Sequence, residues 1–160
     1  MRSGELFGLK WKNVKVYEKN DYKWAEIIVE GETSKVKQDR VFVARGGKYF
    51  ERLKRLSKHT KDNDFVFTLN NGTHWHGKNR LALRYHFEKL LNGVGITDAK
   101  ERKLELYSCR HYGISKRVNN GANIVQLAKD CGTGVEHITK TYYHTNLRNS
   151  ERNMAIMYEE

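Results

Sequence analysis

The sequence predicts an α+β fold, a mostly helical domain that carries a small three-stranded antiparallel sheet. Three short runs in the first third alternate apolar and polar residues and are separated by turn-forming residues. After Gly47 the apolar residues recur at the spacing of helices that bury one face. The chain has 160 residues, of which 38% are hydrophobic, and this is enough for one buried core. We therefore expect one domain over residues 1–160.

The predicted strands follow a short helical segment. In the opening MRSGELFGLKW, Leu6 and Leu9 lie three residues apart, which is typical of the end of a helix. Because such a helix is already under way at residue 1, we expect the chain to be the C-terminal portion of something longer. The expected strands are NVKVY, KWAEIIVE and DRVFVA, and the links EKNDY and GETSKVKQ carry residues that suit hairpin turns.

The remainder of the chain reads as helices. A helix from Gly47 places four apolar residues on one face: Tyr49, Phe50, Leu53 and Leu56. The stretch DNDFVFTLNNGTHWHG predicts a short extended piece and a loop, and KNRLALRYHFEKLLNGVGI predicts a longer helix that stops near Gly93. Further helices are predicted over 105–118, 123–130 and 134–143, with a last one in SERNMAIMYEE.

The charge of the chain indicates the class of its partner. Thirty Lys and Arg oppose nineteen Asp and Glu, giving +11 and an isoelectric point near 9.6, which favours a polyanion. No apolar run approaches the length of a membrane span, and no secretory signal opens the chain. The two cysteines are too few for a disulfide framework and favour a reducing, intracellular setting.

Two clusters could carry chemistry on phosphate. Arg110 and His111 are adjacent and lie near a predicted helix start, where a phosphate is favoured and an arginine can hold two of its oxygens. Tyr142 and Tyr143 are adjacent near the C-terminus; a free phenol is ionised in only about one molecule in 10³ at neutral pH, so a tyrosine nucleophile needs cationic neighbours. The alternatives are a surface arginine on a solvated face and an aromatic pair that packs in the core.

Four stretches together resemble the catalytic domain of the tyrosine recombinase (phage integrase) family: MRSGELFGLKW, SKVKQDRVFV, YSCRHYGI and CGTGVEHITKTYYH. They occur in the family's order at suitable separations, and the resemblance covers essentially the whole chain. It implies the tyrosine recombinase catalytic fold for residues 1–160. It also implies that the family's N-terminal core-binding domain is absent from this chain.

The resemblance assigns roles in the first half of the chain. Arg2, with Glu5 three residues later, matches the family's Arg-x-x-Glu box; the arginine would clamp the scissile phosphate and the acid would brace the helix. Lys35, five residues before Arg40, matches the lysine of the β-hairpin, which would protonate the departing 5′ oxygen. Lys37 is the alternative if the hairpin register differs.

The resemblance also assigns roles near the C-terminus. Arg110 matches the second phosphate-binding arginine. Tyr142 lies nine residues after Thr133 and two before His144, which are the family's spacings for its nucleophile, so Tyr143 is the less favoured candidate.

Two positions depart from the family pattern. Tyr107 fills the usual histidine of His-x-x-Arg, and Cys131-Gly132-Thr133 replaces Leu-Gly-His. Both Tyr107 and Thr133 keep a hydroxyl that can donate a hydrogen bond to phosphate, but neither accepts a proton as readily as histidine. The base that takes the proton of Tyr142 is therefore open, with His111 and His144 as candidates.

The loop THWHG, with His74 and His76, could suggest a metal site. Zinc needs three or four ligands, and both cysteines are remote in the sequence. We expect no metal and no cofactor, because the arginines supply the charge stabilisation in the family that the chain resembles.

The expected function is DNA strand cleavage and joining through a covalent 3′-phosphotyrosine, without ATP. The expected partners are double-stranded DNA and further copies of the chain, forming a tetramer on DNA through the C-terminal segment, with no membrane partner. The setting would be the cytoplasm of a bacterial, archaeal or phage-infected cell. The alternatives are a non-catalytic DNA-binding relative, a type IB topoisomerase-like relaxing enzyme and, least favoured, a metal-dependent nuclease.

Overall fold

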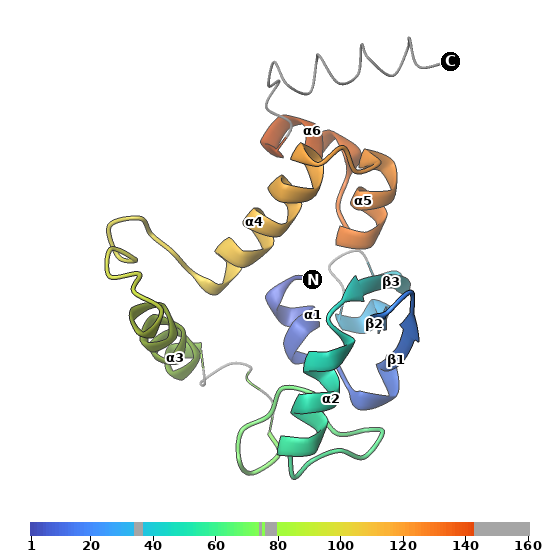
Figure 1. The fold of residues 1–160 in the computed structure, drawn as a ribbon, viewed down its shortest axis with the longest axis vertical. Helices are drawn as coiled ribbons and strands as arrows, with labels where there is room; N and C mark the ends of the chain where they lie inside the picture. Colours follow the sequence, from blue (N-terminus) through green and yellow to red (C-terminus); the bar gives the residue numbers. More distant parts are fainter. Residues whose placement is uncertain (34–36, 74, 76–79, 143–160) are drawn as a thin grey trace. The chain divides into compact units, whose positions relative to one another are not determined.

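The structure is a computed structural model of the chain, and it describes residues 1–33, 37–73, 75 and 80–142. The side chains of residues 33, 80 and 81 lie outside this description. The chain divides into two compact units, Met1–Tyr107 and Ser108–Glu160, and each is described by itself (Figure 1). No helix among the described residues is long and apolar enough to cross a membrane.

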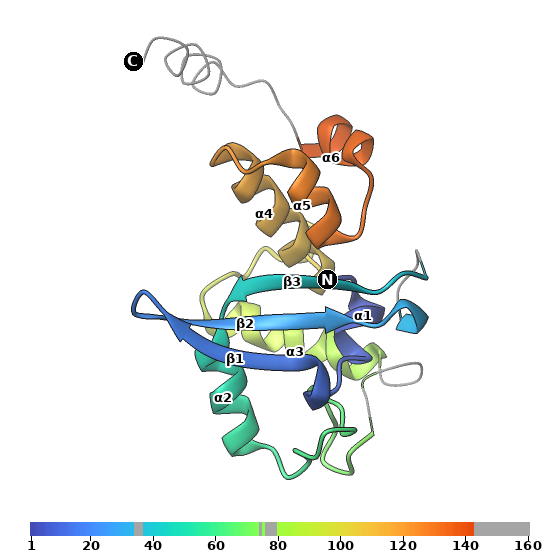
Figure 2. The ribbon, with the colours of Figure 1, turned by 90° about the vertical axis from the view of Figure 1, so that its right-hand side faces the viewer.

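A three-stranded antiparallel sheet organises the first unit. The strands are β1 (Val14–Lys19), β2 (Tyr22–Val29) and β3 (Arg40–Arg45), in the order β1-β2-β3 (Figure 2). β1 and β2 are joined by the two residues Asn20 and Asp21, which both have positive φ (51° and 61°). Two positive φ values suit the twist of a tight hairpin, and Asn and Asp tolerate them better than other non-glycine residues.

One face of the sheet builds the core of the first unit. Its buried cluster contains Leu9, Trp11, Ala25, Ile27, Val29 and Val66. Leu9 and Trp11 come from the segment between α1 (Ser3–Phe7) and β1, which includes the short 3-10 helix η1 (Trp11–Asn13). A second 3-10 helix, η2 (Gly31–Thr33), follows β2.

Helix α2 (Gly47–Leu56) packs against β1 and β2. Of its predicted apolar face, Phe50 and Leu53 contact the core cluster, whereas Tyr49 is 65% exposed and Leu56 is 72% exposed. The predicted helix is confirmed, and two of the four residues on its apolar face, Tyr49 and Leu56, are exposed.

Helix α3 (Arg80–Gly93) completes the elements that precede the division between the units. It ends at Gly93, where the sequence predicted a stop. Among its apolar residues, Leu91 is buried but Tyr85 is 56% exposed, and the side chain of Leu81 lies outside the described part.

Three helices form the described part of the second unit: α4 (Leu106–Asn119), which begins just before the division, α5 (Ile124–Cys131) and α6 (Val135–Tyr142) (Figure 1). Their buried residues are Ile114, Val118, Leu127, Ala128, Ile138 and Tyr142. The side chain of Asn123 accepts a hydrogen bond from the backbone N–H of Gln126, which caps the start of α5. Gly132, at φ 61°, ends α5 in the left-handed conformation that glycine adopts readily.

The predicted sheet is confirmed, and so are the helices that begin at Gly47 and those near 105, 123 and 134, each within about two residues. The prediction for the first segment is wrong: α1 begins at Ser3, with Arg2 as its N-cap residue, and is not under way at residue 1. The last predicted helix, SERNMAIMYEE, lies outside the described residues.

Candidate active site

A buried carboxylate joins two arginines in the first unit. The side chain of Glu5 is 1% exposed, and its Oε1 lies 3.3 Å from Nη1 of Arg2. Arg40 donates from two amino groups, Nη1 to Oε1 at 3.1 Å and Nη2 to Oε2 at 2.6 Å. The backbone N–H of Arg2 donates to Oε2 at 2.7 Å, so Glu5 also caps the start of α1. Arg2 is therefore held at its backbone and at its guanidinium by the same acid.

The environment of Glu5 keeps it ionised. Burial alone would raise the pKa of Glu5, because a carboxylate loses solvation inside a protein. The hydrogen bonds from Arg40 and from the backbone of Arg2, with the charges of both arginines, outweigh burial and lower the pKa of Glu5 below its ordinary value. Glu5 is thus a fixed negative charge between two positive ones.

The connection from β2 to β3 carries the two lysine candidates. Lys37 is described and exposed, with φ 49°, whereas Lys35 lies outside the described residues. The base of this connection is fastened, because the N–H of Gly31 donates to Oδ1 of Asp39 at 2.6 Å. A Cβ at Gly31 would lie 2.9 Å from the carbonyl carbon of Lys37, so only glycine fits there without movement.

In the second unit, Arg110 is the fifth residue of α4 and lies beyond the first turn. The sequence-based expectation that a helix N-terminus assists it is therefore wrong, because the effect of the free N–H groups fades within that turn. Nη2 of Arg110 instead donates to the carbonyl oxygen of Cys131, at the end of α5, at 2.8 Å. Its Nη1 is buried and has no hydrogen-bond partner among the described residues. A buried donor without an acceptor costs about 1 to 3 kcal/mol, so this atom is suited to an incoming anion.

Tyr142, the last described residue of α6, contacts a histidine of α4. Its hydroxyl oxygen lies 2.7 Å from Nδ1 of His111, and the two ring centroids are 5.6 Å apart. The ring of His137 stands edge-on to Tyr142 at 6.0 Å. Tyr142 is 3% exposed and belongs to the core cluster of the second unit, while His111 is exposed. The packing interpretation of Tyr142 and the chemical one are therefore both compatible with its position.

Two further candidates, Tyr107 and Thr133, lie within the described residues. Tyr107 is the second residue of α4, 41% exposed, and lies one helical turn before Arg110. Thr133 is half-buried, and its backbone N–H donates to the carbonyl of Ala128 at 3.0 Å just beyond α5. Tyr143 and His144 lie outside the described residues, as do His74 and His76.

In the second unit α4 thus makes two separate contacts, from Arg110 to the end of α5 and from His111 to Tyr142 of α6. Arg2 and Glu5 form a separate group in the first unit. The contact of Arg40 with Glu5 was not predicted from the sequence, in which Arg40 served only to mark the position of Lys35. The available signal was an arginine at a core-facing position of an alternating strand, where a buried charge needs a partner.

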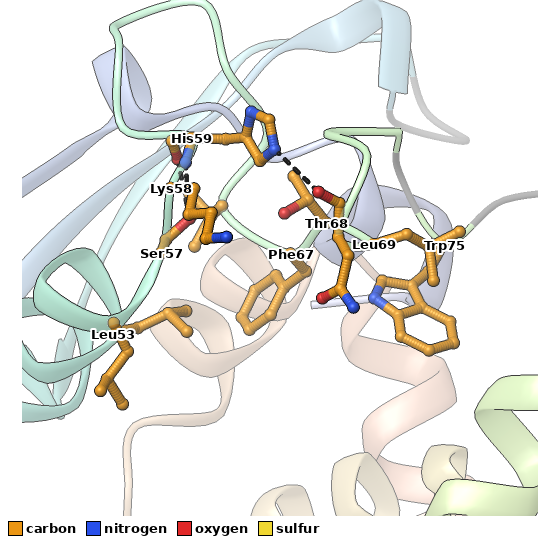
Figure 3. A pocket seen from close by; sticks show the side chains of 11 residues that line it. Leu53, Ser57, Lys58, His59, Phe67, Thr68, Leu69 and Trp75 are labelled. Atoms are coloured by element: carbon orange, nitrogen blue, oxygen red, sulfur yellow. Dashed lines mark hydrogen bonds between the residues drawn. The ribbon is translucent and has the colours of Figure 1, made fainter.

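A pocket of about 510 Å³ lies elsewhere in the first unit, between the end of α2 and the loop that follows (Figure 3). His59 and Trp75 line it, and the ring Nε2 of His59 lies 3.3 Å from the carbonyl oxygen of Asn70. None of the predicted catalytic residues lines this pocket.

No protein-family model matches the sequence, and no curated protein matches it either. The structure is similar to that of the XerH site-specific recombinase bound to its difH substrate in a pre-cleavage complex. The TM-score is 0.64 at 16% sequence identity, over 100% of this chain and 44% of that one. It is also similar to the integrase of the transposon Tn1549 in complex with transposon right-end DNA. Here the TM-score is 0.55 at 15% identity, over 99% of this chain and 55% of that one.

These similarities establish the fold. The chain has a tyrosine recombinase-like α+β fold, as the four sequence motifs implied, and it spans about half the length of the two proteins it resembles. At 15–16% identity the similarity carries no residue role and no activity.

Proposed function

We propose that this chain is the catalytic part of a tyrosine recombinase, which cuts DNA and rejoins it through a 3′-phosphotyrosine. One observation carries the proposal: the phenol of Tyr142 lies 2.7 Å from Nδ1 of His111, the residue next to Arg110. The fold and the charge of +11 support it, and both similar structures are complexes with DNA.

The proposed cleavage step begins at Tyr142. Nδ1 of His111 accepts the phenolic proton when the imidazole carries its own proton on Nε2. The phenolate oxygen forms a bond to the scissile phosphorus, and the bond from phosphorus to the 5′ oxygen breaks. Lys35 gives a proton to that oxygen, which leaves as a hydroxyl; Lys37 is the alternative donor. Because His111 is exposed, solvent can take up the proton that it received.

The two arginines stabilise the charge that develops on the phosphate. In the proposal Arg110 offers its buried Nη1, and Arg2 offers its guanidinium from the start of α1. Fixed donors of this kind act mainly on the transition state, and losing one costs about 3 to 4 kcal/mol of barrier in comparable sites.

The departures from the family pattern fit the same scheme. Tyr107 lies one turn before Arg110 on α4, and Thr133 follows the end of α5 whose Cys131 carbonyl binds Arg110. In the proposal both hydroxyls donate to phosphate oxygens. Neither has to serve as the base, because His111 occupies that place beside Tyr142.

Rejoining reverses these steps on another strand. A 5′-hydroxyl attacks the phosphotyrosine, the phenol of Tyr142 leaves, and the energy of the phosphodiester is conserved without ATP. Exposed cations on α2 and just beyond it would hold the DNA backbone: Lys48, Arg52, Lys54, Arg55 and Lys58. Strand exchange needs several active sites on one DNA complex, so the proposal includes a tetramer linked by the C-terminal segments.

The test is a suicide DNA substrate, nicked near the cut so that the released end is lost and the covalent intermediate accumulates. Wild type should give a protein–DNA band on a denaturing gel, and Tyr142→Phe should give none while it still shifts DNA in a native gel. Tyr143→Phe is the matched control and should form the adduct.

Other outcomes of this test would support the alternative functions. DNA binding with no adduct from wild type would support the non-catalytic relative and sink the proposal. Adduct formation with relaxation of supercoiled plasmid, but without strand exchange, would favour the topoisomerase-like activity. Cleavage that EDTA abolishes would indicate a metal-dependent nuclease.

A further inference from the structure

We propose that Arg40 is a positioning residue of the active site, which keeps Arg2 available to the scissile phosphate by occupying the buried carboxylate of Glu5. This inference rests on the proposed function. It concerns a residue that needs no contact with DNA in order to affect cleavage.

The two arginines contact the carboxylate of Glu5 unequally. Arg40 donates to both carboxylate oxygens, at 3.1 and 2.6 Å, whereas the guanidinium of Arg2 reaches one of them at 3.3 Å. Two parallel donors make the stronger and more directional pair. The carboxylate is therefore oriented mainly by Arg40, and Arg2 has the longer and weaker side-chain contact.

The charges of the three side chains sum to +1, because one carboxylate lies between two guanidiniums. Without Arg40, Glu5 and Arg2 would form a pair of zero net charge. Arg2 would then be drawn onto the carboxylate and would attract a phosphate less strongly. Arg40 thus prevents Glu5 from neutralising the charge of Arg2. Glu5 still binds the backbone N–H of Arg2 through a 2.7 Å hydrogen bond.

The position of Arg40 suits this role. Arg40 is the first residue of β3 and pairs with Val29 of β2, whose side chain is buried. Its own side chain is 12% exposed, against 25% for Arg2, so Arg2 is the more accessible of the two. Arg45, at the other end of β3, is exposed and lies over the ring of Tyr22 at 4.0 Å. It supplies a matched control with the same charge on the same strand.

The test measures single-turnover cleavage of the suicide substrate. Arg40→Gln should slow adduct formation by about 10- to 100-fold, the loss typical when a residue that orients a metal ligand is replaced. Arg45→Gln should cleave like wild type. The same Arg40→Gln change in an Arg2→Ala background should have no further effect, since Arg40 acts only through Arg2. DNA affinity and the thermal midpoint are measured beside each rate.

A rescue variant distinguishes positioning from general destabilisation. Glu5→Gln combined with Arg40→Gln removes the carboxylate that would capture Arg2, and its amide oxygen can still accept from the backbone of Arg2. This double variant should cleave faster than Arg40→Gln alone. If Arg40→Gln does not fold, the cleavage rates of the double variant and of Arg40→Lys are compared with that of wild type instead. Arg40→Lys keeps the charge but loses the paired donors, and it should fall between wild type and Arg40→Gln.

Three results would overturn the inference: cleavage by Arg40→Gln within twofold of wild type, an undiminished loss in the Arg2→Ala background, or no rescue by the double variant. A wild type that forms no adduct is a different result, because it contradicts the proposed function itself.

Discussion

At the scale of single residues, the proposed function depends on the contact between Tyr142 and His111. A buried tyrosine hydroxyl needs a hydrogen-bond partner, and a 2.7 Å bond to an imidazole satisfies it. In the proposed mechanism the same bond carries the phenolic proton to His111. Tyr142 is 3% exposed, so the proposed attack requires that its hydroxyl oxygen becomes accessible to the phosphate.

Replacing His111 should therefore affect chemistry and spare binding. His111→Gln removes the proposed base, and we expect adduct formation to slow by about 10²- to 10⁴-fold, the usual contribution of general acid–base catalysis. The affinity for DNA should be unchanged. His137→Gln is the control, since its ring stands beside Tyr142 without a hydrogen bond to it among the described contacts. Equal rates for the two variants would contradict the role of His111.

The lowered pKa of Glu5 predicts how the stability of the fold depends on pH. Its pKa is lowered from the ordinary value of 4.5, so the folded state binds its proton less readily than the unfolded state does. The stabilisation is fully present above the unfolded pKa and is lost as the pH falls through the folded one. The difference in free energy of unfolding between wild type and Glu5→Gln should therefore shrink as the pH drops below 4.5.

Urea unfolding at a series of pH values measures this difference. Glu18→Gln, a change at an exposed acid of β1, is the control. A difference between wild type and Glu5→Gln that stays constant across the acid range would show that the ion pairs of Glu5 do not contribute as described.

At the scale of elements, α2 meets the sheet at a glycine. Among the glycines for which the distance is described, Gly47 leaves the least room for a Cβ atom. A Cβ at Gly47 would lie 2.6 Å from the carbonyl oxygen of Trp24 and 2.8 Å from Cγ1 of Val16. Both neighbours belong to strands and cannot move freely. This close approach holds the start of α2 against the sheet, and it explains why the helix begins at a glycine.

Gly47→Ala should destabilise the fold by about 1 to 3 kcal/mol, the cost of overpacking a well-packed site. Gly93→Ala at the end of α3 is the control, since a Cβ there meets nothing within 4 Å. It should be neutral or slightly stabilising. Thermal unfolding of both variants checks the prediction, and similar midpoints for the two would contradict it.

The same elements show how far the sequence alone reaches. Alternation in β1, β2 and β3 and the Asn-Asp turn are local signals, so the sheet was predictable. The exposure of Tyr49 and Leu56 was not, because it depends on how much of α2 the sheet covers. The start of α1 was misjudged because the cap at Arg2 comes from Glu5, which reaches back three residues.

At the scale of the whole molecule, the motifs located the candidate residues but not their partners. Which histidine meets Tyr142 depends on the packing of α4 against α6 across 31 residues, and sequence spacing does not encode this. Arg40 meets Glu5 across 35 residues for the same reason. Glu5 and Arg40 both belong to the first unit, and His111 and Tyr142 both belong to the second.

The most direct measurement is to identify the amino acid that becomes linked to DNA. The adduct from the suicide substrate is digested with protease and nuclease, and mass spectrometry locates the nucleotide remnant on the peptide. The proposed mechanism predicts a phosphotyrosine at Tyr142, held through the 3′ end of the cut strand. A remnant on Tyr143, a 5′ linkage or an unmodified peptide from a substrate that was cut would contradict it.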